Sequence, residues 1–247
     1  MKKIFLSWVF FIYACTLIAQ TEPANVSDNK GKQGEWIEKK DSYTMQGNYL
    51  NDKKEGTWRS YNSKGTLVAV ETYKNGLKDG IFLNMDQNGS VSKESYYKND
   101  QLEGTVKEYI FGGRVKSEMS YLKDGLNGWV KKFYDNGNLQ EESQYVNGIK
   151  NGVSKWYTQE GKISIEYNYK NGALDGKQKT FYPNGQINVE DTYFNNVQEG
   201  DTKEFHENGQ LKVQGNYTND QKNGPWKEFD ENGKLIKTTK YLNGVAK

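Results

Sequence analysis

Apolar and turn-forming residues recur along this chain with a fixed period of 24 residues. We number each unit from a glycine at position 0 to position 23, and every unit also has glycine at position 9 and tyrosine at position 17. The position-0 glycines are Gly56, Gly80, Gly104, Gly128, Gly152, Gly176, Gly200 and Gly224; the position-17 tyrosines are Tyr73, Tyr97, Tyr121, Tyr145, Tyr169, Tyr193, Tyr217 and Tyr241. Such self-similarity is the signature of a stacked repeat array.

Two more positions are apolar throughout the array. Position 5 is aromatic in every unit except the one with Met85, and position 11 is always aliphatic. Upstream, Gly34, Trp36, Gly47 and Tyr49 outline a shorter, degenerate unit. Atypical end units are expected of stacked repeats.

Turn signals divide each unit into two strands. The first signal occupies positions 7 to 9, as in Pro183-Asn184-Gly185, and the second runs from position 19 to the next position 0, as in residues 75–80. Runs of about six and nine residues separate these signals, which suits strands and is too short for helices. We therefore expect an all-β fold: an elongated antiparallel β-hairpin repeat array (a meander or solenoid) of about eight 24-residue units plus the degenerate N-terminal unit. We attribute the glycines at positions 0 and 9 to turns that need positive φ.

The strand register follows from the first turn. Pro183 and Gly185 suit a three-residue loop, which pairs position 5 with position 11 and places aromatic and aliphatic side chains on one face. A two-residue loop would instead set basic residues at position 3 opposite glutamates at position 14, as with Lys155 and Glu166. An exposed ion pair contributes about 0–1 kcal/mol, whereas burying an aromatic side chain contributes about 1.5–3 kcal/mol. We therefore expect the three-residue register.

Composition narrows the possible functions. Only 34% of residues are hydrophobic, which is little material for a large core. Aromatic residues make up 14% of the chain, whereas disordered segments are poor in them. Lys and Arg total 34 against 32 Asp and Glu, so we expect no long-range attraction to nucleic acid or to an anionic membrane.

The N-terminal segment differs from the repeats. Residues 1–19 combine a short basic start with an apolar run and are predicted to be a signal peptide, cleaved between Ala19 and Gln20. Residues 20–31 are predicted to be a polar linker and residues 32–247 the repeat domain. Lipid attachment at Cys15 and a retained anchor are competing interpretations, and lipid on Cys15 would be the membrane contact. We expect export to the periplasm, the cell surface or the medium.

The chain offers few residues for catalysis. His206 is the one histidine and occupies the variable position 6, which indicates a surface histidine. Without a second histidine or a cysteine after Ala19, most zinc sites and Ser-His or Cys-His pairs are excluded. Paired carboxylates and calcium ligands at position 23 are alternatives, but their periodicity favours a solvated strand face and turn formation. We therefore predict no enzyme activity, no catalytic residue, no cofactor and no metal.

Aromatic residues that interrupt the repeat pattern are the candidate partner contacts. These are Trp129, Trp156, Tyr167 and Phe194, because exposed aromatics anchor interfaces. The position-17 tyrosines have two interpretations: a sugar- or peptide-binding strip, or an apolar ridge that keeps the hairpins stacked. Their presence in all eight units favours the ridge.

Residues 145–163 and 169–187 share the pattern Y-x-N-G-x₃-(D/E/N)-G-x₄-(Y/F)-x₃-G-x-(L/I/V), which resembles the MORN repeat variant over about residues 32–247. Tryptophan typical of the better-known MORN form is present only at Trp36, Trp58 and Trp226, so its lipid-binding roles are not carried over. Bacterial proteins of this variant include a YwqK-like group labelled as antitoxins of toxin–antitoxin pairs. We expect a non-enzymatic exported scaffold that binds a protein or glycan partner in the bacterial envelope. The alternatives are an antitoxin or immunity protein and, third, a glycan hydrolase.

Overall fold

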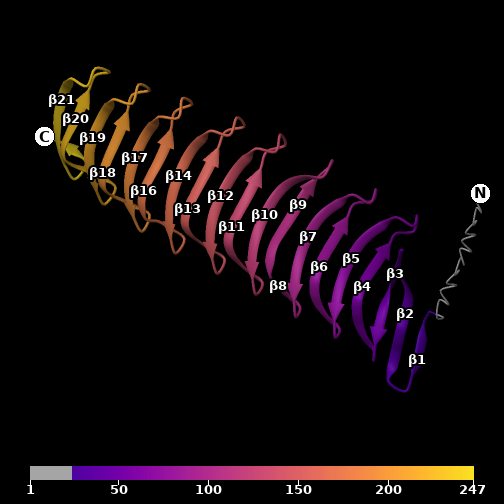
Figure 1. Cartoon of the computed structure of the whole chain (residues 1–247). Helices are drawn as coiled ribbons and strands as arrows, with labels where there is room; N and C mark the ends of the chain where they lie inside the picture. The colour runs from indigo at the N-terminus through magenta and orange to yellow at the C-terminus, as the bar shows by residue number, and fades with distance from the viewer. Residues whose placement is uncertain (1–23) are drawn as a thin grey trace, which may run out of the picture.

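The computed structural model describes residues 24–247, and these form a long antiparallel sheet of consecutive hairpins (Figure 1). The predicted signal peptide, its cleavage site and Cys15 lie outside the described residues. The strands are β1 (Val26–Asp28), β2 (Gly31–Lys40), β3 (Tyr43–Leu50), β4 (Lys53–Tyr61), β5 (Leu67–Lys74), β6 (Leu77–Met85), β7 (Val91–Lys98), β8 (Gln101–Leu102), β9 (Gly104–Ile110), β10 (Arg114–Leu122), β11 (Gly125–Phe133), β12 (Leu139–Val146), β13 (Ile149–Tyr157), β14 (Ile163–Lys170), β15 (Ala173–Leu174), β16 (Gly176–Phe181), β17 (Ile187–Phe194), β18 (Val197–Phe205), β19 (Leu211–Thr218), β20 (Gln221–Phe229), β21 (Leu235–Leu242) and β22 (Val245–Ala246).

Each long strand pairs with the next one along the chain, and every pairing is antiparallel. The short β8 and β15 continue into β9 and β16, so each 24-residue unit supplies one hairpin. The predicted all-β meander of hairpin repeats is confirmed. Among residues 24–247, no helix has the length and apolar character that a membrane crossing requires.

Two kinds of turn alternate along the array. In the first, Gly185 donates to the Tyr182 carbonyl at 2.9 Å and adopts a φ of 91°, which closes the predicted three-residue loop. In the second, Asn171 and Gly172 have φ values of 50° and 85° between paired Lys170 and Ala173. Positive φ at both central residues is the type I′ geometry that suits the twist of a hairpin.

The strand register contains both of the pairings that were considered alternatives: position 5 with position 11, and position 3 with position 14. Position 5 faces position 11, as in Phe181 and Ile187, so the predicted register is confirmed. A β-bulge at Asn188, position 12, then shifts the ladder by one residue, so that Lys179 also faces Glu190. Treating the two pairings as exclusive was wrong, because one extra residue in the returning strand accommodates both.

The position-0 glycines do adopt positive φ, but not in turns as predicted. Gly152 has a φ of 108° and lies inside β13, opposite Tyr169. The ladder between β12 and β13 is irregular next to this residue. The second turn therefore closes at position 20, and the glycine at position 0 serves a bulge within the following strand.

The sheet has two faces of different character. The inner face carries positions 2, 4, 13, 15 and 17, and the outer face carries positions 1, 3, 5, 11, 14 and 16. Within residues 24–247, the buried side chains all lie on the inner face: Trp58, Phe82, Ser95, Val106, Ser117, Ser143, Ser154, Gln178, Thr202 and Trp226. The core is therefore a strip along one face of a single sheet and not a filling between two layers.

The sheet begins within the segment predicted as a linker. Residues 26–28 form β1, in which Val26 faces Gln33 of β2. The backbone nitrogen of Asn25 donates to the Glu35 carbonyl at 2.8 Å, and its side-chain oxygen accepts from the Ile37 nitrogen at 2.8 Å. These contacts cover part of the outer edge of β2, which would otherwise present unpaired backbone groups.

Candidate functional site

The inner face is held together by a ridge of tyrosines at position 17. Phe82, at position 2, packs edge-on between Tyr73 and Tyr97, with ring centroids 5.6 and 4.7 Å apart. Trp226 lies in the same way between Tyr217 and Tyr241, at 5.1 and 6.0 Å. Edge-to-face pairs of this kind stabilise neighbouring hairpins. The geometry supports the interpretation of the tyrosines as a stacking ridge.

Lysines at position 22, two residues before the next glycine, lie over these rings. The Lys222 ammonium is 4.0 Å from the Trp226 ring centroid and 5.4 Å from that of Tyr241. The same arrangement recurs at Lys32, Lys54, Lys78 and Lys150. For Lys54, burial lowers the pKa of the ammonium below its ordinary value. Cation–π attraction accounts for the choice of lysine.

This pairing of lysine with an aromatic residue was not predicted, although it is visible in the sequence. Lysine occurs at position 22 where an aromatic follows at position 2 of the next unit, or at position 4 in the case of Trp156. Where the following position 2 is Val106, Val130, Gln178 or Thr202, position 22 is leucine or glutamine instead.

Four positions of the inner face vary strongly against this constant frame. Position 2 holds Trp58, Phe82, Val106, Val130, Ser154, Gln178, Thr202 and Trp226; position 4 holds Ser60, Asn84, Glu108, Lys132, Trp156, Thr180, Glu204 and Glu228; position 13 holds Ala69, Lys93, Ser117, Glu141, Ile165, Val189, Val213 and Lys237; position 15 holds Glu71, Ser95, Met119, Ser143, Tyr167, Asp191, Gly215 and Thr239. Each unit thus presents a different set of side chains in the same geometry.

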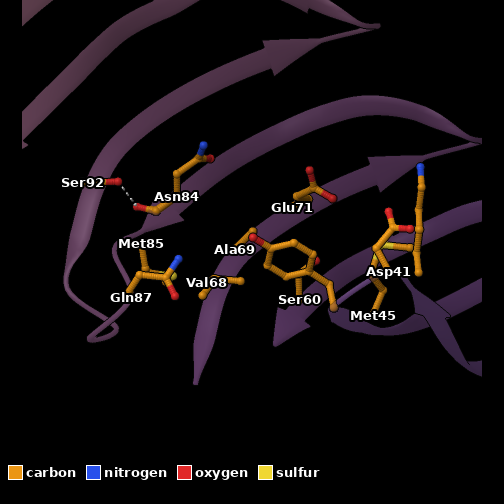
Figure 2. A pocket seen from close by; sticks show the side chains of 12 residues that line it. Asp41, Met45, Ser60, Val68, Ala69, Glu71, Asn84, Met85, Gln87 and Ser92 are labelled. Carbon is orange, nitrogen blue, oxygen red and sulfur yellow. Dashed lines mark hydrogen bonds between the residues drawn. The ribbon is translucent and has the colours of Figure 1, made fainter. Parts of the chain in front are cut away.

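One hollow on this face lies over β4 to β6 and has a volume of about 500 Å³ (Figure 2). Ser60 and Ala69 face each other across the strands at its floor. In other units the residues of this pair have longer side chains, as with Lys132 and Glu141 or Trp156 and Ile165. The remaining lining includes Met45, Glu71, Asn84, Met85, Gln87 and Ser92.

A second hollow of about 370 Å³ lies on the same face over β9 to β12. It is lined by Glu108, Lys116, Ser117, Met119, Val130, Lys132, Phe133 and Gln140. Beside it, Glu141 accepts a hydrogen bond from Lys132 at 2.9 Å and lies 3.6 Å from Lys150. Burial raises the pKa of the Glu141 carboxyl. The hydrogen bond from Lys132 and the charges of Lys132 and Lys150 lower it by more than burial raises it, so the pKa of Glu141 lies below its usual value.

The outer face is more uniform and carries a ladder of charges. Lys155 lies 3.4 Å from Glu166, and Lys179 lies 3.8 Å from Glu190. Burial, together with a hydrogen bond to Glu142, raises the pKa of the Tyr157 hydroxyl. These partly exposed ion pairs each contribute little to stability, and their regularity marks the outer face as a repeated surface in contact with solvent.

The four predicted partner contacts do not form one cluster. Trp156 and Tyr167 lie together on the inner face, edge to face at 5.7 Å. Trp129 lies on the opposite face and is 37% exposed, and Phe194 precedes a type I′ turn and is 60% exposed. Only the first pair adjoins the variable inner face.

The surface position predicted for His206 needs correction. The residue is half-buried, and its Nε2 lies 3.0 Å from the Phe229 carbonyl of the next unit. Tyr134 and Tyr182, also at position 6, donate to the equivalent carbonyls of Tyr157 and Phe205 at 2.8 Å. Position 6 therefore links neighbouring hairpins, a role that variation in residue type concealed.

Position-23 side chains, considered as calcium ligands, also serve the turns. Glu55 accepts from the Asn75 nitrogen at 2.7 Å and Glu199 from the Asn219 nitrogen at 2.8 Å. Within residues 24–247, no group of three or more His, Asp or Glu side chains is placed to hold a metal ion.

Comparison with known proteins agrees with the repeat architecture. A search of curated proteins gives no significant match. The family described as MORN repeat variant matches the sequence at residues 54–75, 126–147, 150–171, 174–195, 198–219 and 222–243, together more than half of the chain. Each matched segment spans one strand-turn-strand region of the sheet, from the start of one long strand to the type I′ turn that follows the next. The chain therefore belongs to the MORN repeat variant family.

Proposed function

We propose that this chain is a non-enzymatic, exported scaffold whose inner face binds a protein or glycan partner in the bacterial envelope. The repeat array provides a rigid frame, and the partner contacts reside in the side chains that differ between units. The apolar run and polar boundary of residues 1–20 support export.

The observation that carries the proposal is the contrast between constant and variable positions on one face. Tyrosine at position 17 is the same in all eight units, whereas positions 2, 4, 13 and 15 hold aromatic, aliphatic, polar and charged residues. A purely structural strip would repeat its packing residues in every unit. Extended surfaces built on a repeated frame are what repeat proteins use for binding.

Trp156 and Tyr167 are the proposed aromatic anchors of this surface. They lie on the inner face between the hollow over β9 to β12 and a smaller one of about 50 Å³ lined by Tyr167, Gln178 and Asp191. Large aromatics beside desolvated hollows contribute most to interfaces.

The test is affinity capture from envelope fractions with the full chain and two matched variants. Trp156→Ala removes an inner-face ring, and Trp129→Ala removes an outer-face ring of the same kind. We expect the native chain and Trp129→Ala to capture the same partner, and Trp156→Ala to lose it. Circular dichroism and thermal unfolding check that both variants keep the native sheet.

Failure to capture any protein or glycan under several conditions would count against the scaffold. Loss of the partner in Trp129→Ala but not in Trp156→Ala would move the binding surface to the outer face.

An antitoxin or immunity role remains the alternative, because it also requires a binding surface and no catalysis. It predicts that co-expression of this chain rescues cells from the toxic product of an adjacent gene. Absence of such a gene, or death of the co-expressing cells, would remove that alternative and leave the scaffold proposal unaffected.

A further inference from the structure

The hollow over β4 to β6 is built by its sequence and is not a by-product of the repeat. Its floor exists because Ser60 and Ala69 are both small at a cross-strand pair where other units place long side chains. The neighbouring unit continues the floor with Asn84, whose strand pairs with that of Ala69. At about 500 Å³, the space falls within the range of about 300–1,000 Å³ that is typical of small-ligand sites.

Polar groups around this hollow have unused hydrogen-bonding capacity. Within residues 24–247, the Asn84 amide and the Ser60 hydroxyl take part in no hydrogen bond; Asn84 contributes only its backbone carbonyl, to Ser92 at 3.1 Å. Glu71 uses one carboxylate oxygen, which accepts from the Tyr73 hydroxyl at 3.1 Å. Figure 2 shows these side chains around one space, with Asp41 at its far end. The wall thus offers both donors and acceptors.

Apolar atoms complete the lining. Met45, Val68 and Ala69 border the same hollow, and Tyr43 at its rim is 42% exposed. The Tyr43 ring can therefore pack against the flat apolar face of a ligand while its hydroxyl group stays in water. A ligand that matches this wall has apolar faces and an edge of hydroxyl groups.

The charges around the hollow are mixed in sign. Its lining carries Lys40 and the two carboxylates of Asp41 and Glu71. Beside the lining, the Lys54 charge acts on Glu71, and Lys93 pairs across the strands with Asn84. A phosphate, sulfate or uronate would therefore meet charges of both signs and not a cluster of cations. The wall suits a neutral ligand.

From this wall we propose that the hollow binds a ring of a neutral saccharide. The ring's C–H face would lie on the Met45 and Ala69 side chains, and its hydroxyl groups would bond to Asn84, Ser60 and Glu71. This inference rests on the proposed function and names the ligand class of one part of the inner face.

The test probes the full chain on an array of neutral oligosaccharides built from glucose, mannose, galactose and N-acetylglucosamine. Sulfated and uronate-containing chains serve as charged counter-probes. Calorimetry on the best neutral probe then compares Asn84→Ala, Ala69→Phe and the matched control Asn188→Ala, which lies on β17 away from the hollow. We expect about a tenfold loss of affinity for Asn84→Ala, complete loss when phenylalanine fills the floor, and no change beyond twofold for Asn188→Ala.

Three outcomes would overturn the saccharide site: no binding to any neutral probe, binding to charged probes alone, or equal affinity in Asn84→Ala and Asn188→Ala. The Asn84 side chain is exposed, and its amide makes no hydrogen bond within the described residues, so its removal tests binding without unfolding the sheet. Capture of an envelope protein that depends on Trp156, with no saccharide binding, would overturn this inference and leave the scaffold proposal standing.

Discussion

Replacing Gly215 by alanine should destabilise the C-terminal hairpins, although alanine is normally the better strand residue. Gly215 does not need positive φ; a Cβ there would lie 2.3 Å from the Trp226 indole. Gly47 shows the same relation to Trp58, at 2.4 Å. Tryptophan at position 2 thus requires glycine at position 15 of the preceding unit, where other units hold larger residues.

The magnitude follows from two opposing effects. Overpacking a buried site costs about 1–3 kcal/mol, and Gly→Ala gains about 0.4–1 kcal/mol by restricting the unfolded chain. We expect Gly215→Ala to lower the free energy of unfolding by about 1–2 kcal/mol. In a Trp226→Val background the clash disappears, and the same change should become neutral or stabilising. Valine is compatible with the position, because Val106 and Val130 occupy it in other units.

Native-state hydrogen exchange of β19 and β20 measures this effect locally, since long repeat arrays need not unfold in one step. Gly125→Ala is the matched control: Gly125 also lacks a positive φ, and its Cβ would meet an ordinary contact at 3.5 Å. The steric explanation is refuted if Gly215→Ala costs as much with valine at residue 226 as with tryptophan.

Three further predictions test other parts of the structure. His206→Ala should lower the free energy of unfolding by about 1 kcal/mol, because it removes the hydrogen bond to the Phe229 carbonyl. His206→Tyr should keep this bond, as Tyr134 and Tyr182 do in their own units. Hydrogen exchange of the residues around Phe229 compares the two variants, and equal effects would contradict the linking role of position 6. Glu141→Gln should cost up to about 1 kcal/mol at pH 7, because the folded-state pKa of Glu141 lies below its unfolded value of about 4.3. That contribution is lost as the pH falls through the folded-state pKa, so native and variant denaturation curves should converge in acid; a constant difference would rule out the charge. Deleting residues 25–30 removes β1 and the Asn25 bonds from the edge of β2. Light scattering should then show more concentration-dependent self-association than in the full chain; equal scattering masses for the two proteins would disprove this role.

The fold was predictable because its signals are local and repeated. Glycine at position 9 marks the three-residue loop, and tyrosine at position 17 marks the paired strand, in every unit. The bulge at position 12 was not predicted, because the pairing of positions 5 and 11 and the pairing of positions 3 and 14 belong to one register only when one residue is inserted between them. The role of Gly152 was misplaced for a related reason: a positive φ can serve a bulge inside a strand as well as a turn.

The candidate site was harder to predict, because it depends on which positions share a face. The bulge makes Ser60 and Ala69 a cross-strand pair, and because both side chains are small, they leave a hollow on the inner face. Trp129 and Trp156 occupy positions 1 and 4 of equivalent strands, so strand alternation alone already places them on opposite faces. One feature of the inner face could have been predicted from the sequence alone: lysine at position 22 accompanies an aromatic residue at position 2 of the next unit.

Spin-label distances between equivalent loop positions test the extended array most directly. In a chain with Cys15 replaced by serine, labels at Gln87 paired with Asp135, Gln159 or Glu207 lie two, three and five units apart. With two strands per unit at about 4.8 Å each, the distances should grow to about 19, 29 and 48 Å, somewhat shortened by twist. Distances that stop increasing between the Gln159 and Glu207 pairs would contradict the account, because the array would then be folded back into a compact body.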